Sequence, residues 1–243
     1  MSCKLCGEDK KLIEAHIIPR SFYKVFKDNG KAPITINDQP GIYPKRSQIG
    51  IYDKEILCED CERIFSTWDD YGYRFLSQEF KEEGYIYNND LKIAYNFGSF
   101  EYENLVMFFL SVLWRAEVSS NKVFYRVQLG PYEKILREVI SSRTLGDNQL
   151  FSVALSKFDA DASETGILNP DRTEYEGVNH YRLYLGGYMV IIKVTNKQPP
   201  ECFDWLYLKP ESDAYCIIRP FKESKEYKAM VHTAKNAYKP VVS

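Results

Sequence analysis

The sequence predicts an α+β protein, on three observations. Two Cys-x-x-Cys pairs, Cys3–Cys6 and Cys58–Cys61, frame a small front segment. Residues 103–118 and 131–143 repeat apolar side chains with the period of helices, and residues 150–219 contain several short runs typical of strands. We therefore expect a cysteine-bearing module over residues 1–85, followed by a mixed α+β domain over residues 86–243.

The front module is expected to begin with a tight cysteine turn over residues 1–7. Next we expect a strand from Lys11 to Ile18, a short helix from Ser21 to Phe26, and a long loop over residues 28–50 with one short strand at Ile34–Ile36. Glycine and proline residues mark that loop. A helix is expected from Cys58 to Phe80, with Gly72 as a weak point where it would break.

The second domain is expected to open with strands and turns over residues 85–102, followed by the two helices. Its strands are predicted at Leu150–Phe158, Tyr181–Leu185, Tyr188–Val194, Phe203–Leu208 and Ala214–Arg219. Gly186-Gly187 fits a hairpin turn between two of them. A helix from Lys222 to Tyr238 is expected to end the chain.

Composition excludes some classes of function. The 243 residues carry a formal net charge of −2, so no global basic field attracts nucleic acid, although a local basic groove is still compatible. No signal-peptide pattern opens the chain, and the longest apolar run, Leu105–Trp114, is too short to span a bilayer. Paired cysteines in this setting favour a cytoplasmic protein with metal ligands rather than disulfides.

The spacing of Cys3, Cys6, Cys58 and Cys61 predicts a tetrahedral structural zinc site. Gly7 permits the positive φ that lets backbone N–H groups approach the sulfur atoms. The second pair lies at i and i+3 where a helix begins, so both thiolates can face one point. A cysteine turn, a hairpin and then this helix form a treble-clef arrangement. The alternative is four unrelated buried cysteines.

These residues resemble the HNH endonucleases, a zinc-bearing ββα-metal family. The resemblance covers roughly residues 1–70 and rests on Cys3-x-x-Cys6, Ala15-His16-Ile17-Ile18-Pro19 and Asp53-Lys54-Glu55-Ile56-Leu57-Cys58-x-x-Cys61-Glu62. It implies that His16 is a general base, taking a proton from the water that attacks a phosphodiester. It also implies a nucleic-acid substrate, with DNA favoured, and one divalent cation. The alternative is a hydrogen-bonded histidine on a strand.

The sequence departs from the family's ligand pattern. Ala15 stands where the family has an acidic or histidine ligand, Glu62 replaces a histidine or asparagine, and Ser66 replaces the closing histidine. Asp53 stands where an asparagine orients the catalytic histidine. The hypothesis is that Glu62, assisted by Asp69 on the same helical stripe, supplies oxygen ligands for Mg²⁺ or Mn²⁺. The alternative is an ordinary solvated acidic face.

Arg20, Lys24 and Arg46 are the candidates for contacts with substrate phosphates, and the alternative is that they lie in a solvated loop. The leading prediction is therefore a metal-dependent endonuclease, which by analogy serves in phage defence. The second is a catalytically degenerate, zinc-stabilised module that binds nucleic acid or protein, with a protein partner recognised by residues 86–243. A third is a zinc-stapled structural subunit of a larger complex. No association with a membrane is expected.

Overall fold

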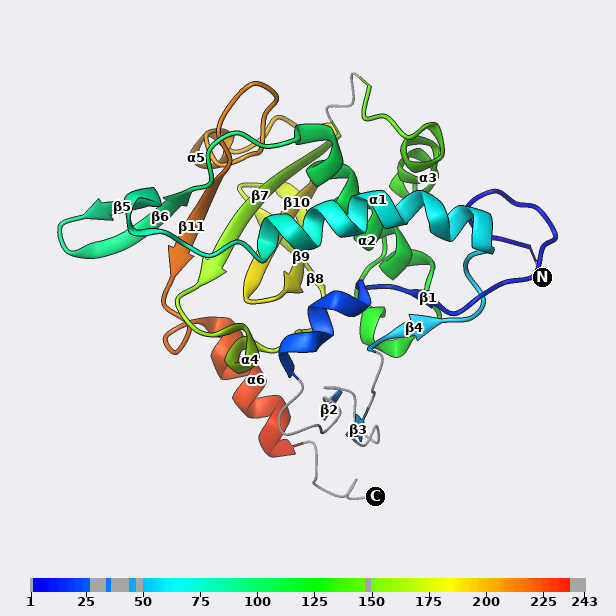
Figure 1. Ribbon diagram of the computed structural model, residues 1–243, viewed down its shortest axis with the longest axis horizontal. Coiled ribbons are helices and arrows are strands. Elements are labelled where there is room, and N and C mark those ends of the chain that lie inside the picture. The colour runs from blue at the N-terminus through cyan, green and yellow to red at the C-terminus, as the bar shows by residue number, and fades with distance from the viewer. Residues whose placement is uncertain (1, 27–33, 36–43, 47–49, 147–149, 237–243) are drawn as a thin grey trace.

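The computed structural model describes residues 2–26, 34–35, 44–46, 50–146 and 150–236. Its centre is a seven-stranded sheet of order β5-β6-β11-β7-β10-β9-β8 (Figure 1). The strands are β5 (Tyr85–Asn88), β6 (Leu91–Asn96), β7 (Phe151–Phe158), β8 (Asp171–Tyr175), β9 (Val178–Leu185), β10 (Tyr188–Val194) and β11 (Tyr215–Arg219). Neighbouring strands are antiparallel, except that β11 runs parallel to β7.

The two faces of the sheet pack against different helices, because successive side chains of a strand point to opposite faces. Val153 of β7 belongs to the larger core, which also contains side chains of α1 (Glu59–Leu76), α2 (Tyr102–Val118) and α3 (Tyr132–Ser142). The next residue, Ala154, belongs to a smaller core on the other face. Side chains of α5 (Glu201–Asp204) and α6 (Lys225–Asn236) pack against this smaller core. The short helix α4 (Ala162–Thr165) follows β7 in the chain.

Helix α2 is buried around its whole circumference, since every residue from Leu105 to Ala116 is buried. This confirms that the apolar run in the sequence is an interior helix. Helix α1 lies beside it (Figure 1) and buries only one side, which includes Phe65, Trp68 and Phe75. Gly72, the expected weak point of this helix, does not break it, because α1 continues through it to Leu76. A Cβ atom there would lie 2.2 Å from the ring of Phe108 on α2, so Gly72 permits the close approach of the two helices.

The smaller elements lie before α1. Strand β1 (Ala15–His16) pairs antiparallel with β4 (Tyr52–Asp53), β2 (Ile34–Thr35) pairs with β3 (Lys45–Arg46), and the 3-10 helix η1 (Arg20–Phe26) follows β1. The strand expected from Lys11 to Ile18 is thus limited to two residues. On either side of these two residues, single backbone hydrogen bonds connect the same two segments. The N–H of Ile13 donates to the carbonyl oxygen of Leu57, and the N–H of Ile17 donates to that of Ile51. Ile36 of the expected loop strand lies outside the described residues.

Several other expectations need correction. Helix α1 ends at Leu76 rather than at Phe80. The strand predicted at Phe203–Leu208 is wrong. Pro200 opens the short helix α5 instead, and only Tyr207 makes an isolated bridge to β7. Strand β8 was not expected, because its polar residues carry no apolar alternation. The short 3-10 turns η2 (Glu82–Gly84) and η3 (Lys122–Phe124) complete the described elements.

One continuous core joins the predicted front module to the rest of the chain. It contains Ile17 and Phe65 from the front together with Leu110 of α2 and Ile192 of β10.

The Gly186-Gly187 turn between β9 and β10 is confirmed, with positive φ at both glycines. Within the described ranges, no helix combines the length and apolar character that crossing a membrane requires.

Replacing Gly72 with alanine should destabilise the protein. In an exposed helix this change gains about 1 kcal/mol of helix propensity. Here the new methyl group would overlap the Phe108 ring, and overpacking of this kind typically costs about 1–3 kcal/mol. We expect a lower free energy of unfolding in urea denaturation. Ser66→Ala, at an exposed position of the same helix, is the control and should change stability by less than about 0.5 kcal/mol. A stabilising Gly72→Ala would contradict the packing argument.

Candidate functional site

The four cysteines of the two pairs converge at the start of α1. Their Sγ atoms all lie within 4.8 Å of one another, which is compatible with a single tetrahedral metal ion. Cys3, Cys58 and Cys61 are buried, whereas Cys6 is exposed. Among the residues that the structure describes, no other group of three or more His, Cys, Asp or Glu side chains gathers ligand atoms so closely.

Backbone hydrogen bonds hold the first cysteine pair in a tight turn. Gly7 adopts a φ of +76° and its N–H donates to the carbonyl oxygen of Cys3 at 2.9 Å. The positive φ expected at Gly7 is therefore confirmed. The N–H of Lys4 donates to the carbonyl oxygen of Ile56, which ties the turn to the segment leading into the second pair. The N–H of Cys58 then points at the Sγ atom of Cys3, 3.5 Å away.

The thiols have the chemistry that a zinc site needs. Burial raises the pKa of Cys3, but backbone N–H groups of Cys6, Cys58 and Leu5 outweigh it and bring that pKa to about 7. Burial also raises the pKa of Cys61, and the thiols of Cys58, Cys3 and Cys6 around it raise it further. Four thiolates cannot gather here without a compensating cation, and a divalent metal ion supplies that charge. The donor set therefore fits structural zinc.

His16 and Glu62 are brought together at the edge of this cluster. His16 lies half-buried on β1, with its ring centroid 6.2 Å from that of Tyr52, its cross-strand neighbour on β4. Glu62, in the first turn of α1, accepts a hydrogen bond from the backbone N–H of His16. Its Oε2 atom is buried and has no hydrogen-bond partner within the described residues. Burial raises the pKa of Glu62; the nearby Arg115 guanidinium opposes this shift, and the charge of Asp69 adds to it.

Asp69 is held by a buried arginine rather than left on a solvated face. Its two carboxylate oxygens accept hydrogen bonds from Arg115 of α2, at 2.6 and 2.9 Å. The Arg115 side chain is 0% exposed and that of Asp69 is 14% exposed. Burial raises the pKa of Asp69, whereas the Arg115 guanidinium opposes that shift. The alternative of an ordinary solvated acidic stripe is therefore wrong for Asp69, because β1 and α2 cover this side of the helix.

Arg115 also donates a hydrogen bond to the carbonyl oxygen of His16, at 2.9 Å. The backbone of His16 is thus held on both sides, through its N–H by Glu62 and through its carbonyl by Arg115. Arg115 was missed by the sequence reasoning. The one signal that could have found it is a charged residue that directly follows the apolar run Leu105–Trp114, because a buried helix tolerates a charge only when the charge is paired.

Asp53 is buried on β4, opposite Ala15 in the β1–β4 register. One of its oxygens accepts the N–H of Glu55, and the other accepts hydrogen bonds from Ser119 and Ser120 just after α2. Burial raises the pKa of Asp53, but these hydrogen bonds outweigh that effect and lower it overall. The carboxylate therefore fixes β4, and with it β1, to the end of α2.

The predicted phosphate-binding residues lie near β1 only in part. Arg20 begins η1 and Lys24 lies one turn later, and both are exposed. The Lys24 ammonium also lies 5.8 Å from the centroid of the Tyr73 ring. Arg46 lies on β3, and its predicted phosphate contact concerns a side chain outside the described part of the structure.

Removing a cysteine ligand should weaken zinc binding. Cys6→Ser is the most informative variant, because Cys6 is exposed and its loss leaves the core intact. We expect about one zinc ion per chain for the wild type and less for Cys6→Ser by elemental analysis. We also expect a chelator to lower the melting temperature of the wild type, since metal binding contributes to folding. Cys216→Ala, at a buried cysteine far from the cluster in sequence, should keep its zinc. Full zinc content in Cys6→Ser would rule out the four-cysteine site.

Asp69→Asn should destabilise the protein strongly. It leaves the buried Arg115 guanidinium without its counter-charge, and breaking a buried pair in this way costs about 3–5 kcal/mol. The measurement is the free energy of unfolding at neutral pH. The matched control is Asp70→Asn, because Asp70 is the exposed neighbour on the same helix and its change should fall within about 0.5 kcal/mol. Equal effects of the two substitutions would contradict the structural role assigned to the ion pair.

Comparison of the chain with protein-family models, with curated proteins and with solved structures found no match. The resemblance to HNH endonucleases therefore rests on the residues of the front module themselves. What those residues provide is a four-cysteine centre, a strand histidine, and a half-buried glutamate that lies between them.

Proposed function

We propose that this protein is a metal-dependent, HNH-like endonuclease in which His16 is the general base. The observation that carries the proposal is the contact between His16 and Glu62. Glu62 directly follows the last cysteine of the cluster and holds the backbone N–H of His16. Its second carboxylate oxygen is buried and has no hydrogen-bond partner in the described part of the chain. In the family that the sequence resembles, this position supplies a ligand of the catalytic metal.

The order of the elements supports a treble-clef zinc module. The cysteine turn comes first, the β1–β4 pair follows, and α1 begins directly after Cys58. The zinc ion is structural in this proposal, since four thiolates leave no open coordination position for substrate. Its role is to fix the start of α1, and therefore Glu62, against the strand that carries His16.

The proposed chemistry is hydrolysis of a phosphodiester bond. His16, in its neutral form, accepts a proton from the attacking water, a task that histidine side chains commonly perform in enzymes. The unpartnered Oε2 atom of Glu62 is the proposed ligand for Mg²⁺ or Mn²⁺, which prefer oxygen. When bound, such a cation stabilises the negative charge on the phosphate and on the leaving oxygen.

The geometry changes the role proposed for Asp69. Its carboxylate already accepts two hydrogen bonds from Arg115, so metal ligation would have to compete with a buried ion pair. We therefore propose that Asp69 positions Arg115, which in turn holds the carbonyl oxygen of His16. Asp53 has a similar positioning role through β4, in keeping with the expectation that it orients the histidine and its strand.

Nucleic acid, with DNA favoured, is the proposed substrate. Arg20 and Lys24 are exposed on η1, a few residues beyond His16, where they can contact phosphates on either side of the scissile bond. The net charge of −2 means that such contacts are local. A cytoplasmic role in phage defence and a protein partner for residues 86–243 remain predictions from the sequence.

The second candidate is a zinc-stabilised binding module without catalysis. It is favoured by Asp69, whose engagement by Arg115 leaves Glu62 as the one carboxylate with an unpartnered buried oxygen among the described residues around His16. A single protein carboxylate is a sparse ligand set, although Mg²⁺ commonly keeps several water ligands. Arg20 and Lys24 would serve a binding module equally well.

The deciding experiment is cleavage of supercoiled plasmid and of single-stranded DNA with Mg²⁺ or Mn²⁺. We expect wild-type cleavage that falls by about 10²–10⁴-fold in His16→Ala, the usual contribution of a general base. Glu62→Gln should also lose activity and should require more metal. The matched controls are His232→Ala and Glu59→Gln, exposed residues on α6 and α1 that should cleave as the wild type does.

Two outcomes would overturn the proposal. Unchanged cleavage by His16→Ala would remove its general base. Absence of cleavage by folded, zinc-loaded wild type on either substrate would instead favour the binding module. In that case, wild-type DNA binding should weaken as salt rises. Weaker binding by Arg20→Gln and Lys24→Gln than by the wild type would then identify these two residues as part of the binding surface.

A further inference from the structure

A cavity of about 310 Å³ lies between α6 and the second face of the sheet, away from the cysteine centre. Its walls come from four places in the chain: the segment after α4, strands β8 and β9, helix α6, and Arg126 after η3. This volume is at the lower end of the range typical of small-molecule sites, roughly 300–1,000 Å³. The cavity shares no residue with the proposed nuclease site, so its occupant is a separate question.

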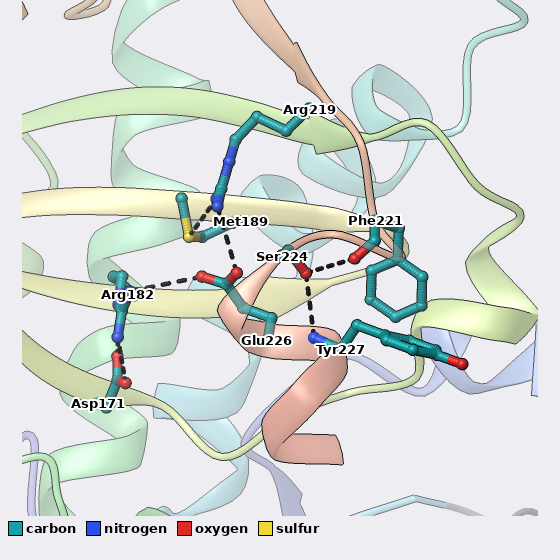
Figure 2. A network of polar contacts seen from close by, with 8 residues as sticks. All are labelled: Asp171, Arg182, Met189, Arg219, Phe221, Ser224, Glu226 and Tyr227. Atoms are coloured by element: carbon teal, nitrogen blue, oxygen red, sulfur yellow. Dashed lines mark hydrogen bonds and ion pairs between the residues drawn. The ribbon is translucent and has the colours of Figure 1, made fainter. Parts of the chain in front are cut away.

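Three of the lining residues, Asp171, Arg182 and Glu226, belong to an ionic network, whose side chains are drawn in Figure 2. Arg182 of β9 makes a bidentate pair with Asp171 of β8, at 2.7 and 2.5 Å. Glu226 of α6, whose side chain is only 4% exposed, lies between Arg182 and Arg219. Its distances to the two guanidinium groups are 3.4 and 3.2 Å, longer than the roughly 2.7–2.9 Å of a strong charged hydrogen bond. Nη1 of Arg182 is therefore only weakly engaged and can bind a further oxygen.

The charge balance of the lining is positive. The charged residues of the lining are the cations Arg126, Arg182 and Lys225 and the carboxylates Asp171 and Glu226, three positive charges against two negative ones, and Arg126 and Lys225 are exposed. Within the described residues, Lys225 has no ion-pair partner, and nothing acidic beyond the network lines the cavity. Cations beside a partly enclosed, low-dielectric space attract an anion more strongly than they would in open water.

Much of the remaining lining is apolar. Ile167 and Leu168 contribute from the segment after α4, and Ala229 and Met230 from α6. Asn169 and Thr233 add neutral polar groups. An inorganic anion would leave this apolar wall in contact with water, whereas a purely apolar ligand would leave the cations unused. Only a molecule with both characters matches the whole lining.

We propose that this cavity binds a small organic anion. Its apolar or aromatic body lies against Leu168, Ala229 and Met230, and its carboxylate or phosphate group faces Arg126, Arg182 and Lys225. Helix α6 contributes to both parts, through Lys225 and Glu226 at its start and Ala229 and Met230 one turn later. A bound ligand therefore joins α6 to β8 and β9, and its binding should stabilise the protein against unfolding.

The test uses two probes on the full-length, zinc-loaded protein: adenosine 5′-monophosphate and decanoate. Each is titrated by calorimetry and by thermal denaturation, and their comparison separates a phosphate-bearing from a carboxylate-bearing ligand. We expect saturable 1:1 binding of at least one probe. Exchanging both rim cations, Arg126→Gln with Lys225→Gln, should weaken that binding by about ten-fold or more, and added salt should weaken it as well.

Two further variants make the result decisive. Ala229→Trp, at an exposed position of α6, should fill the cavity and abolish binding without removing a charge. Lys228→Gln removes an exposed lysine of the same helix that does not line the cavity, and it should bind as the wild type does. Failure of both probes to saturate at millimolar concentration would overturn the proposal. Binding that survives Ala229→Trp would also overturn it, because the site would then lie elsewhere.

Discussion

Arg115 is a charged group in the stretch of α2 that is buried on all sides. Taking a guanidinium out of water is costly, and the cost is offset only if its N–H groups find acceptors in a fixed geometry. Here the acceptors come from three segments far apart in the chain: the carbonyl of His16, the carboxylate of Asp69, and Ser111 on its own helix. One buried charge therefore fixes β1, α1 and α2 relative to one another.

Helix α1 is anchored a second time by the cysteine cluster. Cys61 and Asp69 are eight residues apart on this helix, or about 12 Å at the usual rise per residue. With one end held by the thiols and the middle by Arg115, neither the tilt nor the rotation of α1 is free. Glu62 lies between the two anchors and inherits their rigidity. The close contact at Gly72 with Phe108 extends the same constraint toward the far end of the helix.

The parts of this site that the sequence could predict are those with local signals. The spacing of the cysteines predicted the four-cysteine cluster, and Gly7 predicted its turn. The period of the apolar residues predicted the helices and most of the strands. What could not be predicted depends on contacts between distant segments. By helical periodicity, Asp69 lies on the face of α1 that was expected to be solvated. Its environment differs because it pairs with Arg115, which lies far away in the sequence. Likewise, the apolar residues of Phe203–Leu208 have strand-like composition, but Pro200 and the local turn hydrogen bonds decide their structure.

The strand order of the central sheet has a consequence for how the chain assembles. β11 is the last strand in the sequence, yet it lies in the middle of the sheet, between β6 and β7. The hairpin β5–β6 and the meander β8–β9–β10 with β7 can each form from nearby segments, whereas nothing joins them until residues 215–219 are available. Before that moment β6 and β7 each present an unpaired edge, the kind of surface through which chains associate wrongly. During synthesis, the completion of the sheet must therefore wait until residues 215–219 have left the ribosome.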